Sequence, residues 1–155
     1  MFETIVWATD GSEFADRALP LVVELARTHG SRVVAVHAND MLAGRFGGVP
    51  MLADETELRA KIEEQLDELR VAGFDAELRV ETGVTHGVAE LIAVAATDAG
   101  ADLIVIGTHG RGVAATTLLG SVAKGLLHFA TCPVLVVTPV REPVASRRRE
   151  EVTSG

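Results

Sequence analysis

The sequence predicts a single α/β domain in which helices cover both faces of a parallel, five-stranded β-sheet. Its 155 residues fit one domain. Apolar segments alternate between short β-branched runs and longer stretches of helical periodicity, in the order βαβαβαβαβ, and this alternation is typical of a parallel sheet. Aromatic residues make up only 4% of the chain. Small aliphatic side chains must therefore build the core, and they suit strands that are buried on both faces.

Five short segments are predicted as strands. Most of them are continuous runs of Val, Ile, Leu and Ala, a pattern that indicates burial on both faces. One run, at 76–82, alternates apolar and polar residues instead, as a half-exposed strand near a sheet edge does. The predicted strands are Thr4–Ala8, Arg32–Ala38, Ala76–Thr82, Asp102–Gly107 and Pro133–Thr138.

Four longer segments are predicted as helices. Ser12 is a good N-cap for the first of them, and the acidic Glu13 favours the positive end of the helix dipole. Pro20 should kink this helix without ending it, because the apolar stripe continues to about Thr28 before Gly30 stops the helix. The other predicted helices are Thr56–Ala72, Gly87–Ala99 and Ser121–Phe129, and a glycine-rich loop at 41–51 precedes the first of these three.

The charge distribution separates a folded body from a tail. The chain carries a net charge of −8 at pH 7, and so acidic a body is a poor general partner for nucleic-acid phosphates. From Arg141 onward the sequence is charged and contains Ser and Pro, which indicates disorder. We therefore expect a domain over residues 1–140, a disordered tail over residues 141–155, and no nucleic-acid partner.

The sequence shows neither a secretory signal nor a membrane span. No basic N-terminal region precedes a long apolar stretch, and no window approaches the roughly 18 uncharged apolar residues of a span. Cys132 is the only cysteine, which excludes an internal disulfide and any multi-cysteine metal site. The histidines form no i, i+4 ligand pair, so no metal site is predicted. We expect a cytoplasmic protein with no membrane contact.

A glycine-rich segment between the predicted strand 102–107 and the last predicted helix carries the chemistry. Its spacing is G-x2-G-x9-G-[S/T], formed by Gly107, Gly110, Gly120 and Ser121. Glycines let backbone N–H groups turn inward and let a phosphate approach them closely. The first N–H groups of a helix can hold a second phosphate. The segment therefore predicts a phosphate site at the carboxyl end of the sheet, where open α/β sheets bind ligands.

This spacing resembles the nucleotide-binding signature of the ATP-binding branch of the universal stress protein family. The likeness covers nearly the whole chain, from Thr4 to about Val140. The segments that resemble the family's first-strand end, second-strand end and closing strand are Ala8-Thr9-Asp10-Gly11-Ser12, Val36-His37-Ala38 and Cys132-Pro133-Val134-Leu135-Val136-Val137. The resemblance implies the strand order 3-2-1-4-5 and a homodimer formed through the last strand, Pro133–Val137. If that apolar strand is a sheet edge, a second copy would cover it.

The resemblance also implies a site for an adenine nucleotide. Asp10 would accept hydrogen bonds from the ribose hydroxyls, and the backbone of Ala38 would meet the adenine. The expected nucleotide-binding residues are Ala8, Thr9, Asp10, Ala38, Gly107, His109, Gly110, Arg111, Gly112, Gly120, Ser121 and Val122. ATP, ADP and AMP are not distinguished, because backbone contacts to phosphate are permissive. Mg²⁺ would arrive with the nucleotide, bound mainly by phosphate oxygens.

Three of these side chains have a second interpretation. Asp10 can be an additional cap for the first helix. Arg111 can be a solvated loop charge rather than a partner of the terminal phosphate. His109, the one obvious proton-transfer candidate in the loop, can simply pack or hydrogen-bond there. No catalytic residue is assigned.

Three functions remain open at this point. The first is a stress-response regulatory module that binds ATP with at most slow turnover, since the segment lacks a well-placed general base and the Gly-Lys-[Ser/Thr] element of P-loop enzymes. The second is a slow ATP hydrolase, in which Asp10, His109 and a metal position a water. The third is a nucleotide-free dimeric interaction protein, whose glycine-rich connection holds no ligand.

Overall fold

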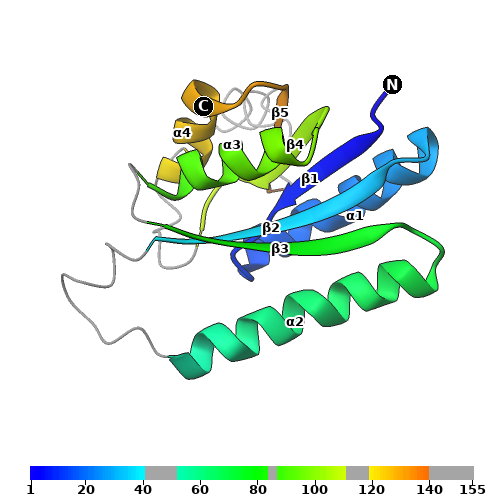
Figure 1. Cartoon of the computed structure of the whole chain (residues 1–155), viewed down its shortest axis with the longest axis horizontal. Helices are drawn as coiled ribbons and strands as arrows, with labels where there is room; N and C mark the ends of the chain where they lie inside the picture. Colours follow the sequence, from blue (N-terminus) through cyan, green and yellow to red (C-terminus); the bar gives the residue numbers. More distant parts are fainter. Residues whose placement is uncertain (41–51, 84–86, 111–118, 140–155) are drawn as a thin grey trace, which may run out of the picture.

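The computed structural model describes residues 1–40, 52–83, 87–110 and 119–139, and these contain five strands and four helices in the predicted order (Figure 1). The strands are β1 (Thr4–Ala8), β2 (Arg32–Asp40), β3 (Ala76–Gly83), β4 (Leu103–Gly107) and β5 (Val134–Val137). The helices are α1 (Glu13–His29), α2 (Leu52–Val71), α3 (Val88–Asp98) and α4 (Ser121–Phe129). The predicted loop at 41–51 and the tail at 141–155 lie outside the described residues. None of the four described helices is long and apolar enough to cross a bilayer.

The strands form one parallel sheet in the order β3-β2-β1-β4-β5, which confirms the predicted fold class and strand order. β1 pairs with β2 on one side and with β4 on the other, so strand order reverses at β1. In open α/β sheets, such a reversal opens a crevice beyond the carboxyl ends of the strands. The topology therefore places Ala8 and Gly107, the last residues of β1 and β4, beside a candidate ligand site.

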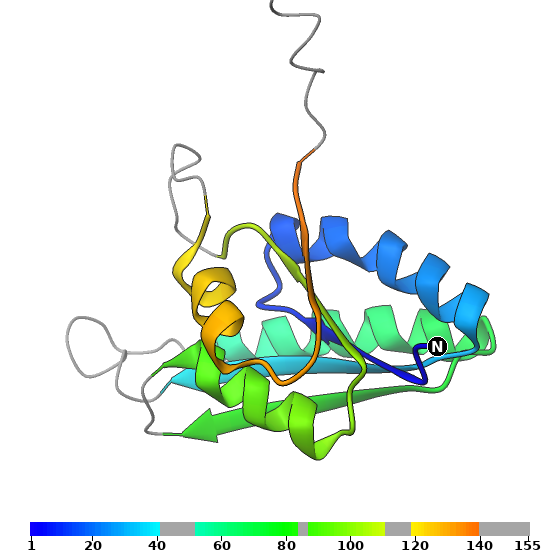
Figure 2. The same cartoon turned by 90° about the horizontal axis from the view of Figure 1, so that it is seen from above.

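Two separate apolar cores hold the layers together. Side chains alternate between the faces of a strand, so neighbouring residues of β1 and β4 belong to different cores. Trp7 and Val105 pack in the core beneath α1 and α2, whereas Ala8 and Ile106 pack in the core beneath α3 and α4. Figure 2 shows α1 and α3 on opposite sides of the strands. Both faces of the central strands are buried, as their continuous apolar runs predict.

α1 begins and ends at its predicted capping residues. The Ser12 side chain accepts a hydrogen bond from the Ala15 N–H at 3.4 Å, and Gly30 ends the helix in the left-handed conformation with φ of 68°. The helix continues through Pro20. The fully buried Trp7 donates from its indole nitrogen to the Ala15 carbonyl at 3.1 Å. These contacts fix the first turn of α1 against β1, directly beside the end of that strand.

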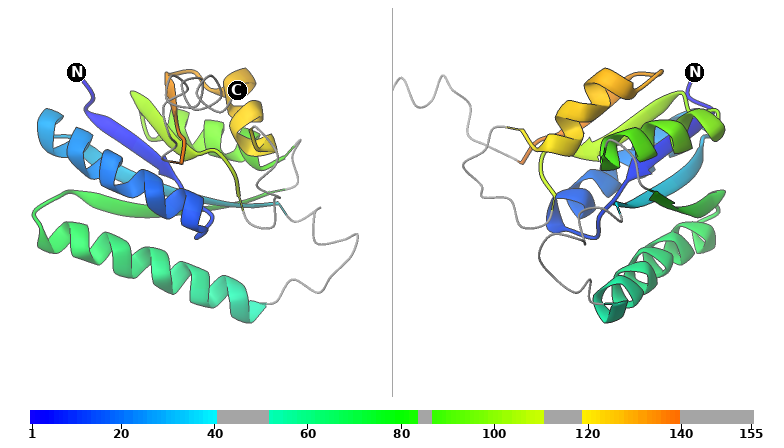
Figure 3. Two further views of the ribbon diagram at one scale, coloured as in Figure 1. Left: turned by 180° about the vertical axis from the view of Figure 1, so that it is seen from behind. Right: turned by 60° about the vertical axis from the view of Figure 1, so that its left-hand side comes forward.

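α2 is longer than its apolar periodicity predicts. It begins at Leu52 rather than at Thr56. Leu, Ala and Glu form helices readily, and acidic residues favour a first turn, but residues 52–55 carry no apolar periodicity that would reveal the helix. Figure 3 shows α2 running along β3 on one side of the sheet. The additional turn places Glu55 within hydrogen-bond distance of β2.

Candidate functional site

A cleft lies at the carboxyl ends of β1, β2 and β4, between these strands and the helices α3 and α4. Its volume is about 330 Å³, which is within the range of small-molecule pockets. Ten of the twelve predicted binding residues line it: Ala8, Thr9, Asp10, Ala38, Gly107, His109, Gly110, Gly120, Ser121 and Val122. The other two, Arg111 and Gly112, lie outside the described residues.

Several other residues of the cleft wall are not predicted from the sequence. They are Ala15, His37, Asn39, Glu55, Val88, Ile92, Ile106, Thr108 and Ala123. Val88 and Ile92 come from α3 and give the cleft an apolar side. His37 and Asn39 could have been found from their position next to Ala38 at the end of a strand. No local signal identifies Glu55, because it precedes the predicted helix.

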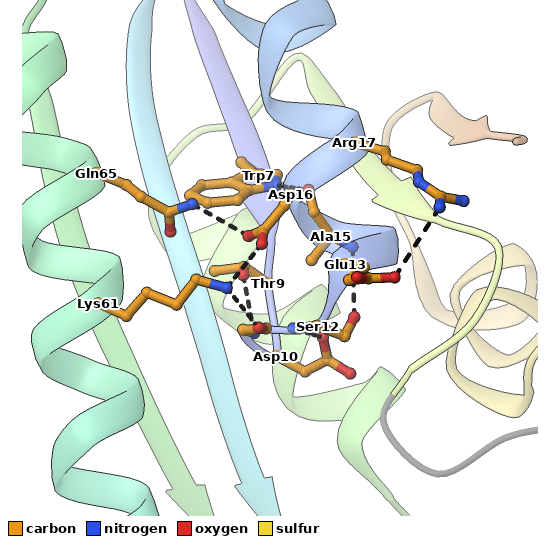
Figure 4. A network of polar contacts seen from close by, with 11 residues as sticks. Trp7, Thr9, Asp10, Ser12, Glu13, Ala15, Asp16, Arg17, Lys61 and Gln65 are labelled. Atoms are coloured by element: carbon orange, nitrogen blue, oxygen red, sulfur yellow. Dashed lines mark hydrogen bonds and ion pairs between the residues drawn. The ribbon is translucent and has the colours of Figure 1, made fainter. Parts of the chain in front are cut away.

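Asp10, in the turn after β1, lines the cleft. Asp10 Oδ1 accepts a hydrogen bond from the Ser12 N–H at 2.9 Å, and Thr9 Oγ1 accepts one from the Gly11 N–H at 3.1 Å (Figure 4). Gly11 has φ of 74°, a backbone conformation that favours glycine. The carboxylate therefore caps the start of α1, as the alternative interpretation expects, and lines the cleft at the same time.

Side chains of α2 hold this turn from the other side (Figure 4). Lys61 donates to the Gly11 carbonyl at 2.8 Å and to the Asp16 carboxylate at 2.7 Å. Gln65 donates to the second oxygen of Asp16 at 3.0 Å. Leu58 packs so closely that a Cβ on Gly11 would lie 2.7 Å from Leu58 Cγ. The turn is therefore positioned by a helix that lies 50 residues further along the chain.

Gly107, the last residue of β4, and Gly110, three residues later, provide room rather than an unusual backbone conformation. Neither Gly107 nor Gly110 has a positive φ. A Cβ on Gly107 would lie 2.6 Å from the backbone oxygen of Phe14 in α1. A Cβ on Gly110 would lie 2.7 Å from Asp10 Oδ2. The chain after β4 therefore passes directly over the first turn of α1 and meets the Asp10 turn.

The start of α4 presents backbone donors to the cleft. The Gly120 N–H donates to the Thr108 carbonyl at 2.7 Å, and the first bond within the helix is donated by the Lys124 N–H. Gly120 thus shapes the entry of the helix, and its own N–H is already used. Among the described residues, the N–H groups of residues 121–123 have no partner within the helix, and no side chain caps them. Together with the helix dipole, they form a site suited to an anion.

His109 is packed into the cleft wall. Only 7% of the residue is exposed. Its ring centroid lies 5.1 Å from that of Phe14, and its Nδ1 lies 2.8 Å from Thr108 Oγ1. This is the arrangement that the packing interpretation of His109 expects.

His37 joins three elements beside the cleft. Its Nδ1 lies 3.1 Å from the Thr9 carbonyl oxygen, and its Nε2 lies 2.9 Å from Glu55 Oε1. Arg59 also donates to that oxygen of Glu55, at 3.2 Å. The ring, which belongs to β2, therefore links the residue that follows β1 to α2. Within the described ranges, no three His, Cys, Asp or Glu side chains are grouped to hold a metal ion.

The comparisons with known proteins agree with this geometry. The model of the universal stress protein family matches residues 1–138. The chain belongs to the universal stress protein family. A universal stress protein of Thermus aquaticus is 36% identical over 145 residues, which cover 88% of this chain and 99% of that protein. The resemblance predicted from the glycine spacing is confirmed.

Solved structures of universal stress proteins share the fold. Protein MJ0577 of Methanocaldococcus jannaschii superimposes with a TM-score of 0.77 and 29% identity, over 92% of this chain and 99% of that one. A universal stress protein of Archaeoglobus fulgidus, solved in complex with dAMP, gives a TM-score of 0.64 at 26% identity over 88% and 97% of the two chains. Another, solved in complex with cAMP, gives 0.59 at 26% identity over 88% and 96%.

Proposed function

We propose that this universal stress protein binds an adenine nucleotide, foremost ATP, in the cleft and acts as a stress-response regulatory module with at most slow hydrolysis. One observation carries the proposal: a single cleft of about 330 Å³ joins the anion site of α4 to the carboxylate of Asp10. A nucleotide complements both, because its phosphates are anionic and its ribose hydroxyls donate to carboxylates. The relatives solved with dAMP and cAMP support the choice of an adenine base.

The chemistry of the walls suggests how the nucleotide lies. The phosphates would rest against the N–H groups of residues 121–123, and the ribose would lie beside Asp10. The adenine would lie between the backbone of Ala38 and the apolar side formed by Val88 and Ile92, all of which line the cleft.

The other groups predicted from the sequence would lie near the phosphates of the nucleotide, at the start of α4. Arg111 would pair with the terminal phosphate, and Gly112 would belong to the same phosphate-binding segment. Mg²⁺ would be carried in on phosphate oxygens, since this ion needs few protein ligands there. Slow hydrolysis follows from the position of His109, whose ring contacts Thr108 and Phe14. A packed ring is a poor general base for an attacking water.

The proposal includes a homodimer formed through β5 (Pro133–Val137 in the sequence analysis) and a cytoplasmic location. β5 is the last strand of the sheet, and all four of its residues are partly exposed. On the adjoining α4, 63% of Leu127 and 44% of Phe129 are exposed. An apolar edge of this kind needs a cover. Val136→Lys should yield folded monomers by light scattering and circular dichroism, and an unchanged mass would contradict the dimer.

Calorimetric titration with ATP, ADP and AMP tests nucleotide binding, with GTP as the control for the base. We expect saturable heat with the adenine nucleotides and much weaker heat with GTP. The absence of saturable heat up to about 1 mM ATP, which corresponds to a binding free energy near −4 kcal/mol, would overturn the proposal in favour of a nucleotide-free interaction protein.

Ser121→Pro is the variant that isolates the phosphate end. Ser121 is the first residue of α4, a position where proline is tolerated. Gly120 before it has φ of −69° and ψ of 160°, which suit a residue that precedes proline. The variant removes one backbone donor and one hydroxyl while preserving the helix. We expect ATP to bind about tenfold more weakly and adenosine to bind as before. Equal losses for the two ligands would contradict a phosphate site at α4.

A further inference from the structure

The His37 ring is held between two hydrogen-bond acceptors. Nδ1 lies 3.1 Å from the backbone carbonyl of Thr9, which can only accept, so the proton of this contact belongs to the ring. Nε2 lies 2.9 Å from the carboxylate of Glu55, which also accepts when it is ionised. A neutral imidazole has a single N–H and can satisfy only one of these contacts. Both contacts are satisfied when the ring carries a proton on each nitrogen.

The Glu55 oxygen that faces the ring has a second charged partner. Arg59, one helical turn further along α2, donates to the same oxygen at 3.2 Å. β3 contributes no charge on this side, because the register neighbour of His37 is Val80. An ionised carboxylate accepts from both neighbours, which makes Glu55 an acceptor toward Nε2 of the ring.

We propose that His37, as an imidazolium, is a positioning residue for the nucleoside side of the cleft, and that loss of its Nε2 proton weakens nucleotide binding. This inference rests on the proposed nucleotide site. The ring ties the last carbonyl before Asp10 to the first turns of α2. When the Nε2 proton leaves for solvent, lone pairs of the ring and of Glu55 face each other across 2.9 Å, and the two groups separate.

Two consequences of deprotonation have the same sign. First, the end of β1 loses its link to α2, so the turn that carries Asp10 is less well fixed. Second, a positive charge beside the cleft disappears, which reduces the attraction for an anionic ligand. Nucleotide affinity should therefore decrease when this proton is lost.

The test is a calorimetric titration with ATP from about pH 5.5 to about pH 8.5. The wild-type protein should bind ATP about tenfold more weakly at the upper end of this range, a coupling of ordinary size between two sites. Glu57→Gln is the matched control, because it removes a carboxylate from the same helix at an exposed position two residues away. Its pH profile should follow that of the wild type.

Two variants separate the links made by the ring. In Glu55→Gln, the amide can donate to a neutral ring or accept from a charged one, so the link persists at every pH. Its profile should therefore fall less steeply with pH than that of the wild type, because only the loss of the ring's positive charge remains. In His37→Asn, the amide nitrogen takes the place of Nδ1 and keeps the Thr9 contact, but the link to α2 is lost. Its profile should be flat near the weak, high-pH affinity.

The outcomes distinguish this inference from the proposed function. Titration of the ATP phosphates cancels in the ratio between variants, because every variant meets the same ligand. Parallel profiles for the wild type and Glu55→Gln would overturn the role of His37 while leaving nucleotide binding intact. If no variant binds ATP, the proposed function fails. The ring-nitrogen NMR signals of the nucleotide-free protein then show whether His37 carries a proton on each nitrogen. A proton on Nδ1 alone would overturn the proposed imidazolium.

Discussion

The two sides of the cleft are built in different ways. On the side of α4, backbone N–H groups of residues 121–123 and the closely packed Gly107 and Gly110 form the wall. On the side of α2, charged and polar side chains hold the wall together, with Lys61 on the β1–α1 turn and Glu55 on the His37 ring. Backbone donors do not titrate, whereas carboxylates, amines and imidazoles do. The α2 side should therefore respond to pH and to charge substitutions, and the α4 side to changes in shape.

The two sides also differ in the sequence distance that their contacts span. On the α4 side, the Gly120 N–H bonds to Thr108, and both belong to one connection between a strand and a helix. On the α2 side, the contact between Lys61 and Gly11 spans 50 residues, and that between Glu55 and His37 spans 18. The α2 side is thus completed only when the layers of the fold have assembled.

The largest expected effect is on the shape of the α4 side. Gly107→Ala should lower the free energy of unfolding by about 3 kcal/mol. Its Cβ would lie 2.6 Å from the Phe14 carbonyl oxygen and 2.8 Å from the carbonyl carbon, so one backbone must move. Gly100→Ala is the matched control, with φ of 67° and nothing within 4 Å; backbone strain alone should cost about 1 kcal/mol there. Denaturant unfolding of both variants tests the difference, and equal losses would contradict it.

Gly110→Ala should act across the cleft. Its Cβ would lie 2.7 Å from Asp10 Oδ2, the end of a side chain that can rotate away, so we expect stability to change by about 1 kcal/mol or less. The rotated carboxylate would lose its ribose contact, and the affinities for ATP and adenosine should both fall about tenfold. Parallel calorimetry with the two ligands measures this. A loss for ATP alone would assign Gly110 to the phosphate end only.

The α4 side could be predicted from the sequence because its signal is local. The glycine spacing, the preceding apolar strand and Ser121 at a helix start all lie within one short segment. The order of elements likewise predicts the parallel sheet, because the apolar pattern of each segment is enough to predict whether that segment is a strand or a helix. The sequence did not show why Gly107 and Gly110 must be glycines. Spacing suggests freedom of the backbone, whereas Phe14 and Asp10, which occupy the space beside Gly107 and Gly110, come from elsewhere in the chain.

The α2 side could not be predicted, for a physical reason. Periodicity identifies the buried stripe of α2, including Leu58, but it does not show which polar residues flanking that stripe reach the sheet edge. Lys61 and Gln65 look like part of a solvated face until α2 is laid beside the β1–α1 turn. Glu55 was harder still, because it belongs to a turn of helix without an apolar pattern.

Lys61→Met should weaken nucleotide binding by disturbing only the α2 side of the cleft. The Gly11 carbonyl and Asp16 lose a common donor, so the Asp10 turn is held less firmly and ATP should bind about threefold more weakly. The stability loss should stay below about 1 kcal/mol, because 44% of the Lys61 side chain and 33% of the Asp16 side chain are exposed. Arg70→Met removes a paired cation from the far end of the same helix and should leave the affinity unchanged. Equal affinities in the two variants would contradict the role of Lys61.

The smallest expected effect concerns a carboxylate at the opposite end of the sheet. Backbone N–H groups of Thr4 and Glu3 donate to Asp102 at 3.0 and 2.7 Å, and these bonds lower its pKa below the ordinary value of 3.8. Because the folded pKa lies below the unfolded one, the carboxylate stabilises the fold above the ordinary pKa, and this contribution is lost as the pH falls through the lowered pKa.

Asp102→Asn should therefore flatten the acid limb of the stability profile, measured by thermal unfolding at low pH, and should do so only slightly because the group is partly exposed. The same variant should leave the pH profile of ATP binding unchanged, since that profile depends on the His37 link at the cleft. If Asp102→Asn altered the binding profile as well, the pH dependence would have to come from the stability of the whole sheet. The distinction between a titrating α2 side and a shape-determined α4 side would then fail.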